Sequence, residues 1–484
     1  MGNGGEAERR LAAKYRGWSE ACIVDFPKLA VCLESVARHY EHDAEWRDER
    51  AAGANIKPAG AKSDGWPREE APQTKVTGSI PVASTIFLPY SRMRRLRAAA
   101  TGDPMPSFYE FFAGGGMVRA GLGEGWTCLF ANDFDARKGL SYQANWGAGG
   151  ELNVGDIRAL KAADLPGEPD LVWGSFPCQD LSLAGAGAGL GGERSGTFHA
   201  FWDVIRGLIA QDRAPRLVAV ENVCGTLTSH GGRDFETICR TFAEAGYRCG
   251  PLVINAELFV PQSRPRLFVI GVRDGVEVAP ELLSPEPVDP FHTRAVRRAT
   301  STLPEAVRDR LLWWNLPTPA RRTTTFADLI EDEPDSVGWH NQAETKRLLD
   351  LMSPVNAAKV EAARRAGRRR VGGVYRRTRL EGGSKVQRAE VRFDDVAGCL
   401  RTPGGGSSRQ ILLVVDGPYV RSRLISARET ARLMGLPDDY LLPRNYSDAY
   451  HLTGDGVAVP VVRHLARHVF EPLVAAAVPA RRAA

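Results

Sequence analysis

The sequence of 484 residues lacks the features that would place it in a membrane or a secretory pathway. No stretch approaches 18 consecutive apolar residues, which excludes a membrane-spanning helix. The N-terminus does not have the basic-then-apolar layout of a signal peptide, and its sixth residue is Glu6 rather than the Ser or Thr that N-myristoylation prefers. We therefore expect a cytoplasmic protein with no membrane partner.

Cysteine and histidine are also sparse and irregularly placed. The eight cysteines contain no C-x-x-C pair, and no H-x-x-x-H pair carries a flanking Glu. These absences argue against zinc ribbons, a disulfide framework and any metal site. Hydrophobic residues make up 43% and charged residues 25% of the chain, which excludes a wholly disordered or fibrous protein. We expect an ordinary globular protein with more than one domain.

Charge is distributed unevenly along the chain. The formal net charge is only +5, but residues 359–409 hold 14 Lys and Arg against five acids, a net charge of +9. The first 104 residues carry +2, so the remainder of the chain carries −6. A polyanionic partner is the interpretation that this asymmetry favours. The alternative is a solvated, Arg-rich loop or helix face.

Residues 1–104 form a poorly patterned leader. The segment from Thr77 to Thr85 resembles a peptide translated through a transfer-RNA gene, and Met105 stands just before the first strongly patterned strand. We hypothesise that the natural start is Met105 or Met93 and that the leader is over-annotated. Peptide mass mapping of the native protein would test this hypothesis.

From residue 105 to 275, short apolar runs alternate with stretches of helical spacing. Such alternation predicts a mostly parallel sheet with helices on both faces. The predicted strands are 107–112, 127–132, 171–176, 216–223, 250–256 and 266–272. Residues 276–415 are rich in Pro, Arg and Gly and predict a second, irregular region. Residues 416–484 become helical again and predict a return to the first domain.

The first predicted strand runs into a glycine loop that includes Gly114 and Gly116, and a helix-compatible stretch follows. Glycines allow close approach of a ligand, and a helix N-terminus offers free N–H groups. The next strand ends at Asp133, whose carboxylate suits the hydroxyls of a ribose, and Asp156 follows where it could reach an adenine edge. A plain tight turn is the better interpretation of the loop alone, but the whole series favours an adenosine-containing cofactor.

The next predicted site lies where a strand ends in Pro177 and Cys178. Taken alone, Cys178 would more often be a buried structural residue. Two later strand ends add Glu221 and the pair Arg264 and Arg266, which would point the same way in extended chain. These residues could form a structural ion-pair cluster. Alternatively, a thiolate, a carboxylate and two guanidiniums at one sheet edge suit attack on an electron-poor ring.

Over residues 108–475 the chain resembles the DNA (cytosine-5)-methyltransferases. The order of motifs is the family's common, unpermuted one. It is carried by FAGGG (112–116), ND (132–133), GDI (155–157), PCQ (177–179), ENV (221–223), QxRxR (262–266), RLISARETARLMGLPD (423–438) and GDGV (454–457). The sequence departs from the family pattern at Asp133, where Glu is commoner, at Met117, where an aromatic residue is commoner, and at Asp455, which replaces the usual Asn.

The resemblance implies an α/β fold: a Rossmann-like S-adenosylmethionine-dependent methyltransferase large domain with a smaller, irregular target-recognition domain. Residues 105–275 would be the catalytic and cofactor-binding domain and 276–415 the target-recognition region. Residues 416–484 would hold the late motifs and the C-terminal helices. The implied cofactor is S-adenosyl-L-methionine, held by Phe112, Gly114, Gly116, Asp133, Asp156, Ile157, Pro177, Asp455 and Val457.

The implied reaction transfers a methyl group to carbon 5 of cytosine in a specific duplex DNA sequence, after the base has been flipped out of the helix. Cys178 would attack carbon 6, Glu221 would hold nitrogen 3, and Arg264 and Arg266 would anchor the base. We expect a monomer associated with the bacterial nucleoid while it acts, and leave open a cognate restriction endonuclease. The alternatives are methylation of transfer RNA and a catalytically silent DNA-binding protein.

Overall fold

The computed structural model describes residues 105–177, 196–401 and 409–475, together with Arg9, Ala13, Arg16, Glu20 and Glu41. The chain divides into two compact units, Met1–Ile86 and Phe87–Ala484. In the first unit, Arg16 Nη1 lies 2.7 Å from Glu41 Oε1. The rest of the leader, and with it the hypothesis about the start of the chain, lies outside the described residues. Everything that follows concerns the second unit.

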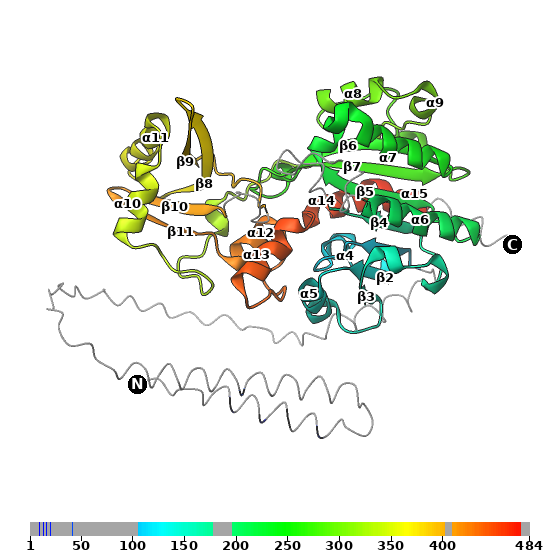
Figure 1. Ribbon diagram of the computed structural model, residues 1–484, viewed down its shortest axis with the longest axis horizontal. Coiled ribbons are helices and arrows are strands. Elements are labelled where there is room, and N and C mark those ends of the chain that lie inside the picture. The colour runs from blue at the N-terminus through cyan, green and yellow to red at the C-terminus, as the bar shows by residue number, and fades with distance from the viewer. Residues whose placement is uncertain are drawn as a thin grey trace, which may run out of the picture. The chain divides into compact units, whose positions relative to one another are not determined.

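The larger of the two sheets in this unit has seven strands (Figure 1). Its order is β3 (Leu152–Val154), β2 (Thr127–Asp133), β1 (Ser107–Phe111), β4 (Leu171–Gly174), β5 (Leu217–Val223), β7 (Pro265–Arg273) and β6 (Tyr247–Asn255). All strands are parallel except β7, which runs antiparallel to both of its neighbours. The predicted α/β fold class is therefore confirmed. The six predicted strands are present, while the three-residue β3 is too short to give a pattern.

Successive side chains of a strand point to opposite faces of the sheet, so alternate residues pack into two separate hydrophobic cores. On one face, Phe108, Trp173 and Ile270 pack with α4 (Met117–Leu122), α14 (Val459–Leu465) and α15 (Glu471–Ala475). On the other face, Tyr109 and Val172 pack with α6 (Thr197–Ala210), α7 (Arg233–Glu244) and α8 (Arg294–Ser301). The remaining helices of this part are α5 (Ala136–Trp146) and α9 (Glu305–Arg308). The burial of both faces explains why the strands read as continuous apolar runs.

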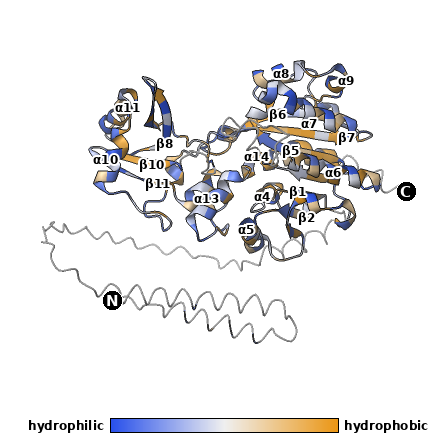
Figure 2. Cartoon of the chain, viewed as in Figure 1, coloured by the Kyte–Doolittle hydropathy of each residue, from blue (hydrophilic) through white to orange (hydrophobic). Residues whose placement is uncertain are grey.

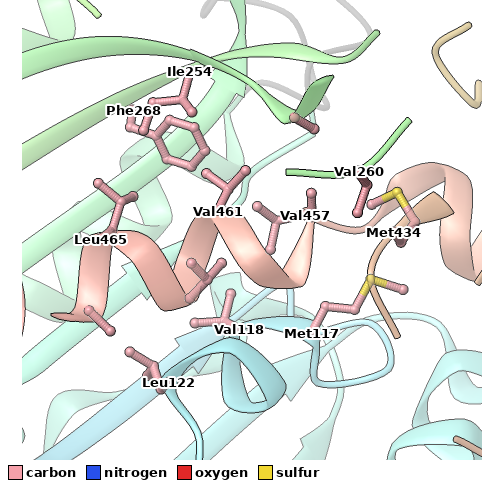
Figure 3. Packing of buried hydrophobic residues seen from close by; sticks show 14 of the residues in the cluster. Met117, Val118, Leu122, Ile254, Val260, Phe268, Met434, Val457, Val461 and Leu465 are labelled. Carbon is pink, nitrogen blue, oxygen red and sulfur yellow. The ribbon is translucent and has the colours of Figure 1, made fainter. Parts of the chain in front are cut away.

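Helix α14, close to the C-terminal end of the described residues, covers the same face of the large sheet as α4. Figure 3 shows α14 lying between α4 and the strands β6 and β7. Val461 and Leu465 of α14 belong to the same buried cluster as Val118 of α4 and Phe268 of β7. Because residues so far apart in sequence share one core, the glycine loop before α4 and the final motif before α14 are held close together.

A second sheet of four antiparallel strands follows, in the order β11 (Tyr419–Leu424), β10 (Ile411–Asp416), β8 (Arg370–Glu381) and β9 (Ser384–Arg392). Its core includes Val374, Val391 and Leu413 and is covered by α10 (Gln342–Asp350) and α11 (Pro354–Arg365). The outer half of the β8–β9 hairpin is exposed and hydrophilic (Figure 2). This region holds more regular structure than its composition indicated. The β10–β11 hairpin also spans the predicted boundary at 415, so the second sheet ends at Leu424.

Two more helices, α12 (Ala427–Leu433) and α13 (Tyr446–Asp455), lead back toward α14. Arg423, just before α12, forms a fully buried ion pair at 2.6 Å with Glu429 in the first turn of that helix. Ser426 and Glu429 also form a capping box at the N-terminus of α12. Among the described residues, no helix has the length and apolar character to cross a membrane. The short 3₁₀ helices lie at Ile157–Ala159, Ala162–Asp164, Cys224–Leu227, Ser229–Gly232, Ala256–Leu258, Pro280–Leu282 and Ala327–Leu329, and a π-helical turn lies at Ala466–Phe470.

Candidate active site

The glycine loop after β1 adopts a backbone that few residues tolerate. Phe112, Gly114 and Gly116 have φ values of 59°, 56° and 78°, all in the left-handed region. A Cβ at Gly116 would lie 2.2 Å from the indole nitrogen of Trp146, so glycine is required there for space as well as for conformation. At Gly114 a Cβ would meet nothing within 4 Å, so this side of the loop is open to a ligand. A bulky residue such as Phe112 in this conformation is strained, as is common at functional sites.

Two aromatic side chains from distant parts of the sequence donate hydrogen bonds to the middle of this loop. The carbonyl of Gly115 accepts a hydrogen bond from Trp146 Nε1 at 2.9 Å and another from the Tyr440 hydroxyl at 2.7 Å. Trp146 ends α5, whereas Tyr440 lies beyond the second sheet. The loop is thus fixed before any ligand arrives, which lowers the entropy cost of binding.

Asp133 at the end of β2 is tied to the glycine loop. One carboxylate oxygen accepts the N–H of Gly114 at 2.7 Å and the other accepts the N–H of Asp135 at 2.8 Å. Burial raises the pKa of Asp133, against the lowering effect of the Lys138 charge and these two hydrogen bonds. The predicted ribose-binding acid therefore lies directly beside the loop, in a fixed orientation.

Glu110, next to the carboxyl end of β1, is a site residue that the sequence did not point to. It is 1% exposed, and its two carboxyl oxygens accept the N–H groups of Val118 at 3.1 Å and Arg119 at 3.2 Å. Burial raises the pKa of Glu110 to about 8. An acid between Tyr109 and Phe111 in an otherwise apolar strand was the available signal. Its contacts correct one expectation, because these two N–H groups of α4 are not free for a ligand.

A pocket opens beside the glycine loop. Its lining includes Glu110, Phe112, Gly114, Lys138, Asp455 and Val457. Four predicted cofactor residues (Phe112, Gly114, Asp455 and Val457) thus meet at one hollow. Lys138 of α5 donates to Asp455 of α13 at 2.7 Å across its wall. Asp455, which stands where the family usually has Asn, is therefore paired with the positive charge of Lys138.

The loop that carries Asp156 and Ile157 sits next to β2. Asn132 donates its side-chain amide to the carbonyl of Gly155 at 2.9 Å, which ties this loop to the end of β2. Both oxygens of Asp156 accept hydrogen bonds from Arg158, and these bonds hold the pKa of Asp156 below its ordinary value. Ile157 is buried and begins a 3₁₀ helix. Asp156 thus lies in a loop tied to the end of β2 and is paired with Arg158, and its contact with adenine stays a prediction.

The second cluster lies at the carboxyl end of β5. Glu221 is 6% exposed, and its carboxylate lies 3.1 Å from Nε of Arg266 on the neighbouring strand β7. Asn222 donates to the carbonyl of Phe176 at 3.3 Å, linking β5 to the segment that ends in Pro177. Cys178 and the loop that follows it lie outside the described residues. The structure thus brings together Glu221 and Arg266 and leaves the thiol unplaced.

Arg264 has partners of a different kind from those expected. It is 2% exposed, and its guanidinium donates to the backbone carbonyls of Leu400 at 2.9 Å, Gly454 at 2.9 Å and Gly456 at 2.7 Å. Burial, followed by the nearby charge of Arg266, lowers its pKa. These contacts link the segment after β9 to the final motif, and the expected role of Arg264 in anchoring the base stays a prediction.

Both arginines reach the thiol of Cys399, as their predicted common direction requires. Sγ lies 3.5 Å from Nη1 of Arg264 and 3.8 Å from Nη2 of Arg266. Burial alone would raise the pKa of Cys399, but the charges of the two arginines outweigh it and the pKa is lowered. Gln262 of the same motif joins the segments further, accepting from the N–H of Leu400 at 3.1 Å and donating to the carbonyl of Leu433 at 2.7 Å. No local pattern around Cys399 indicated this position.

The seven-stranded sheet and the pocket beside its glycine loop fit an α/β methyltransferase. The chain belongs to the C-5 cytosine-specific DNA methylase family, whose model matches residues 107–471. It is a DNA (cytosine-5-)-methyltransferase, and the methyl donor of the family is S-adenosyl-L-methionine.

Curated relatives match across most of their length. The chain is 27% identical over 372 residues to type II methyltransferase M.HpaII of Haemophilus parainfluenzae, covering 76% of this chain and 90% of that protein. It is 26% identical over 364 residues to M.NlaX of Neisseria lactamica, covering 74% and 95%. Among solved structures, the S. pombe Dnmt2 methyltransferase is similar at 17% identity with a TM-score of 0.47, covering 76% of this chain and 99% of that one.

Proposed function

We propose that this methyltransferase acts on a specific sequence of duplex DNA, with the target cytosine flipped out of the helix and held in a covalent adduct with Cys178. The observation that carries the proposal is the Glu221–Arg266 pair, which stands at the carboxyl edge of the sheet. Ligands of such sheets bind at this edge. The pocket lined by Glu110 and Gly114, which we propose holds the cofactor, lies at the same edge and supports this assignment.

The residues present suit the cofactor. The open side of Gly114 permits close approach, and Asp133 supports ribose hydroxyls from beside the loop. Phe134 follows Asp133 with 77% of its surface exposed, which offers a flat apolar face to adenine, while Asp156 and Ile157 lie in the adjoining loop. When bound, S-adenosylmethionine supplies a methyl group on a sulfonium centre. Gly116 and Pro177 complete the set by shaping the two loops.

In the proposed reaction, the thiolate of Cys178 forms a bond to carbon 6 of the cytosine ring, and carbon 5 becomes nucleophilic. Glu221 holds nitrogen 3, and Arg266 keeps the carboxylate in place. After the methyl group has been added, the proton on carbon 5 passes to solvent and the carbon–sulfur bond breaks, which restores the thiolate. Arg264 acts at a distance by bracing the loops around this centre.

Duplex DNA is the favoured substrate because the basic segment retains surplus positive charge after its acids have been paired. Four of its five acids form ion pairs with arginines: Glu361 with Arg364, Glu381 with Arg388, Glu390 with Arg379, and Asp394 with Arg392. Exposed cations remain at Arg365, Arg368 and Lys385. Such groups suit contacts to phosphates, which make binding steeply dependent on salt.

A decisive experiment measures transfer of labelled methyl groups to duplex DNA and to transfer RNA, with Cys178→Ala as the inactive control. We expect labelling of DNA alone, and a trapped protein–DNA complex when the target cytosine carries fluorine at carbon 5. Labelling of transfer RNA would favour the alternative substrate. Binding of DNA without any transfer would favour a silent binding protein. Turnover by Cys178→Ala would contradict the covalent mechanism.

The proposal extends to the setting in which the enzyme acts. Its curated relatives are named type II methyltransferases, so we propose a role in restriction-modification with a cognate endonuclease as partner. We also propose that the enzyme acts as a monomer. Methylation-sensitive sequencing of a host that expresses the protein would read the target sequence, and sedimentation of the complex with DNA would give its stoichiometry.

A further inference from the structure

Lys138 is the cation in the wall of the cofactor pocket, and the family pattern gives no reason for it. The pocket lining includes the acids Glu110 and Asp455, and among the described residues that line it Lys138 alone carries positive charge. Its ammonium donates to Asp455 at 2.7 Å, joining α5 to the end of α13. The two side chains are 20% and 38% exposed, so the pair is within reach of a ligand.

Several backbone donors that line the pocket already have partners within the chain. A helix N-terminus after a glycine loop would normally be the place for an anion. Here the carboxyl of Glu110 accepts two N–H groups of α4, and the carboxylate of Asp133 accepts the N–H of Gly114 in the loop. Intramolecular bonds thus bind the N–H groups of pocket residues Ala113, Gly114, Val118 and Ser175. A carboxylate that enters this pocket would meet carboxyl groups on two sides and finds its matching charge at Lys138.

S-adenosylmethionine brings such a carboxylate. Its methionine end carries an ammonium and a carboxylate, so an ion pair in the wall is complementary to it. We propose that Lys138 binds the carboxylate of the cofactor's methionine end and that Asp455 holds the Lys138 ammonium in position for it. This inference rests on the assignment of the pocket to S-adenosylmethionine. The alternative is that Lys138 only neutralises Asp455 and makes no contact with the cofactor.

Binding of two ligands to the purified full chain, without DNA, separates these possibilities. S-adenosylmethionine has the carboxylate, whereas decarboxylated S-adenosylmethionine keeps the sulfonium and the amine but lacks that group. Calorimetric titration of Lys138→Gln should show roughly tenfold weaker binding of S-adenosylmethionine, because a charge-assisted hydrogen bond is removed. Its affinity for the decarboxylated ligand should stay within about threefold of wild type. Lys138→Arg should restore most of the affinity, since it keeps the charge.

Asp455→Asn is the matched control, because it breaks the same ion pair but leaves the ammonium. It should weaken binding of S-adenosylmethionine less than Lys138→Gln does, since the ammonium remains and an amide can still accept from it. The double variant Lys138→Gln/Asp455→Asn leaves no unpaired charge and should still lose the preference for the carboxylated ligand. Thermal unfolding of each variant reports folding independently of binding.

Equal losses for both ligands in Lys138→Gln would overturn the inference and make the pair structural, as would equal losses of S-adenosylmethionine binding in Lys138→Gln and Asp455→Asn. Neither result would touch the proposed function, because the wild-type chain would still bind the cofactor. If the wild-type chain bound neither S-adenosylmethionine nor S-adenosylhomocysteine, the cofactor assignment and this inference would fall together.

Discussion

The carboxyl edge of the large sheet and the β8–β9 hairpin of the small sheet carry the same kinds of charged group in opposite settings. At the edge, Glu110, Glu221 and Arg264 are at most 6% exposed, and each has fixed partners. On the hairpin, Arg379 pairs with Glu390 while half of its own side chain is exposed. A buried charge that loses its partner costs several kcal/mol, whereas exposed pairs contribute little. The burial of a charge, rather than the number of charges, therefore distinguishes the groups that form the site from the exposed groups that we propose contact DNA.

The first way to break this comparison is to remove charge at the reacting centre. Glu221→Gln keeps the shape of the side chain but removes the charge that pairs with Arg266 and that we propose holds ring nitrogen 3. We expect kcat for methyl transfer to duplex DNA to fall about 10³-fold, within the range for loss of a catalytic acid or base. Initial rates with saturating DNA measure this effect. Retention of more than a tenth of the wild-type rate would contradict the role of Glu221.

Arg264 tests whether buried charge at the same edge serves structure instead. Arg264→Met removes the donor to three backbone carbonyls, and we expect the free energy of unfolding in urea to fall by about 3–5 kcal/mol. The exposed Arg379→Met is the matched control and should change it by less than about 1 kcal/mol. Similar values for the two variants would remove the distinction between the regions.

The raised pKa of the buried Glu110 carboxyl predicts that the free energy of unfolding depends on pH. Its pKa rises from 4.5 to about 8 because of burial, so folding takes up a proton between these values. The stabilisation is fully present below pH 4.5 and is lost as the pH rises through 8. Between pH 5.5 and 8, wild type should lose about 3 kcal/mol relative to Glu110→Gln, which cannot titrate. Urea denaturation of both proteins across this range gives the difference, and parallel curves would show that Glu110 is not the titrating group.

Much of the large domain could be predicted because local pattern and tertiary setting agree there. Runs such as LVWG read as strands since both faces are buried, and Asp133 and Glu221 fall at strand ends, which converge at one edge of a parallel sheet. The partners of Arg264 could not be predicted, because Leu400, Gly454 and Gly456 lie more than 130 residues away in sequence. The Lys138–Asp455 pair was hidden for the same reason, and the antiparallel direction of β7 left no trace in its apolar pattern.

The small sheet was harder to predict because β8 and β9 are exposed toward the turn that joins them. Residues 376–381 of β8 are exposed, so alternation of polar and apolar side chains fades and the charge of the segment dominates its composition. That charge favoured a polyanion-binding region but concealed the hairpin. Cys399 was missed since its significance depends entirely on the two arginines that the fold brings beside it.

The smallest expected effect on stability, and the sharpest test of the comparison, comes from the hairpin itself. Arg377→Gln/Arg379→Gln should leave the free energy of unfolding unchanged within about 1 kcal/mol. The slope of log affinity for duplex DNA against log salt should nevertheless shrink by about 1 for each phosphate that the variant no longer binds. Arg206→Gln on α6 is the control, because Arg206 is also half-exposed and paired with an acid, Asp203, but lies on the large domain. If both variants lowered the slope equally, the hairpin would have no special part in binding DNA. If neither did, the positive charge of residues 359–409 would be only a solvated surface.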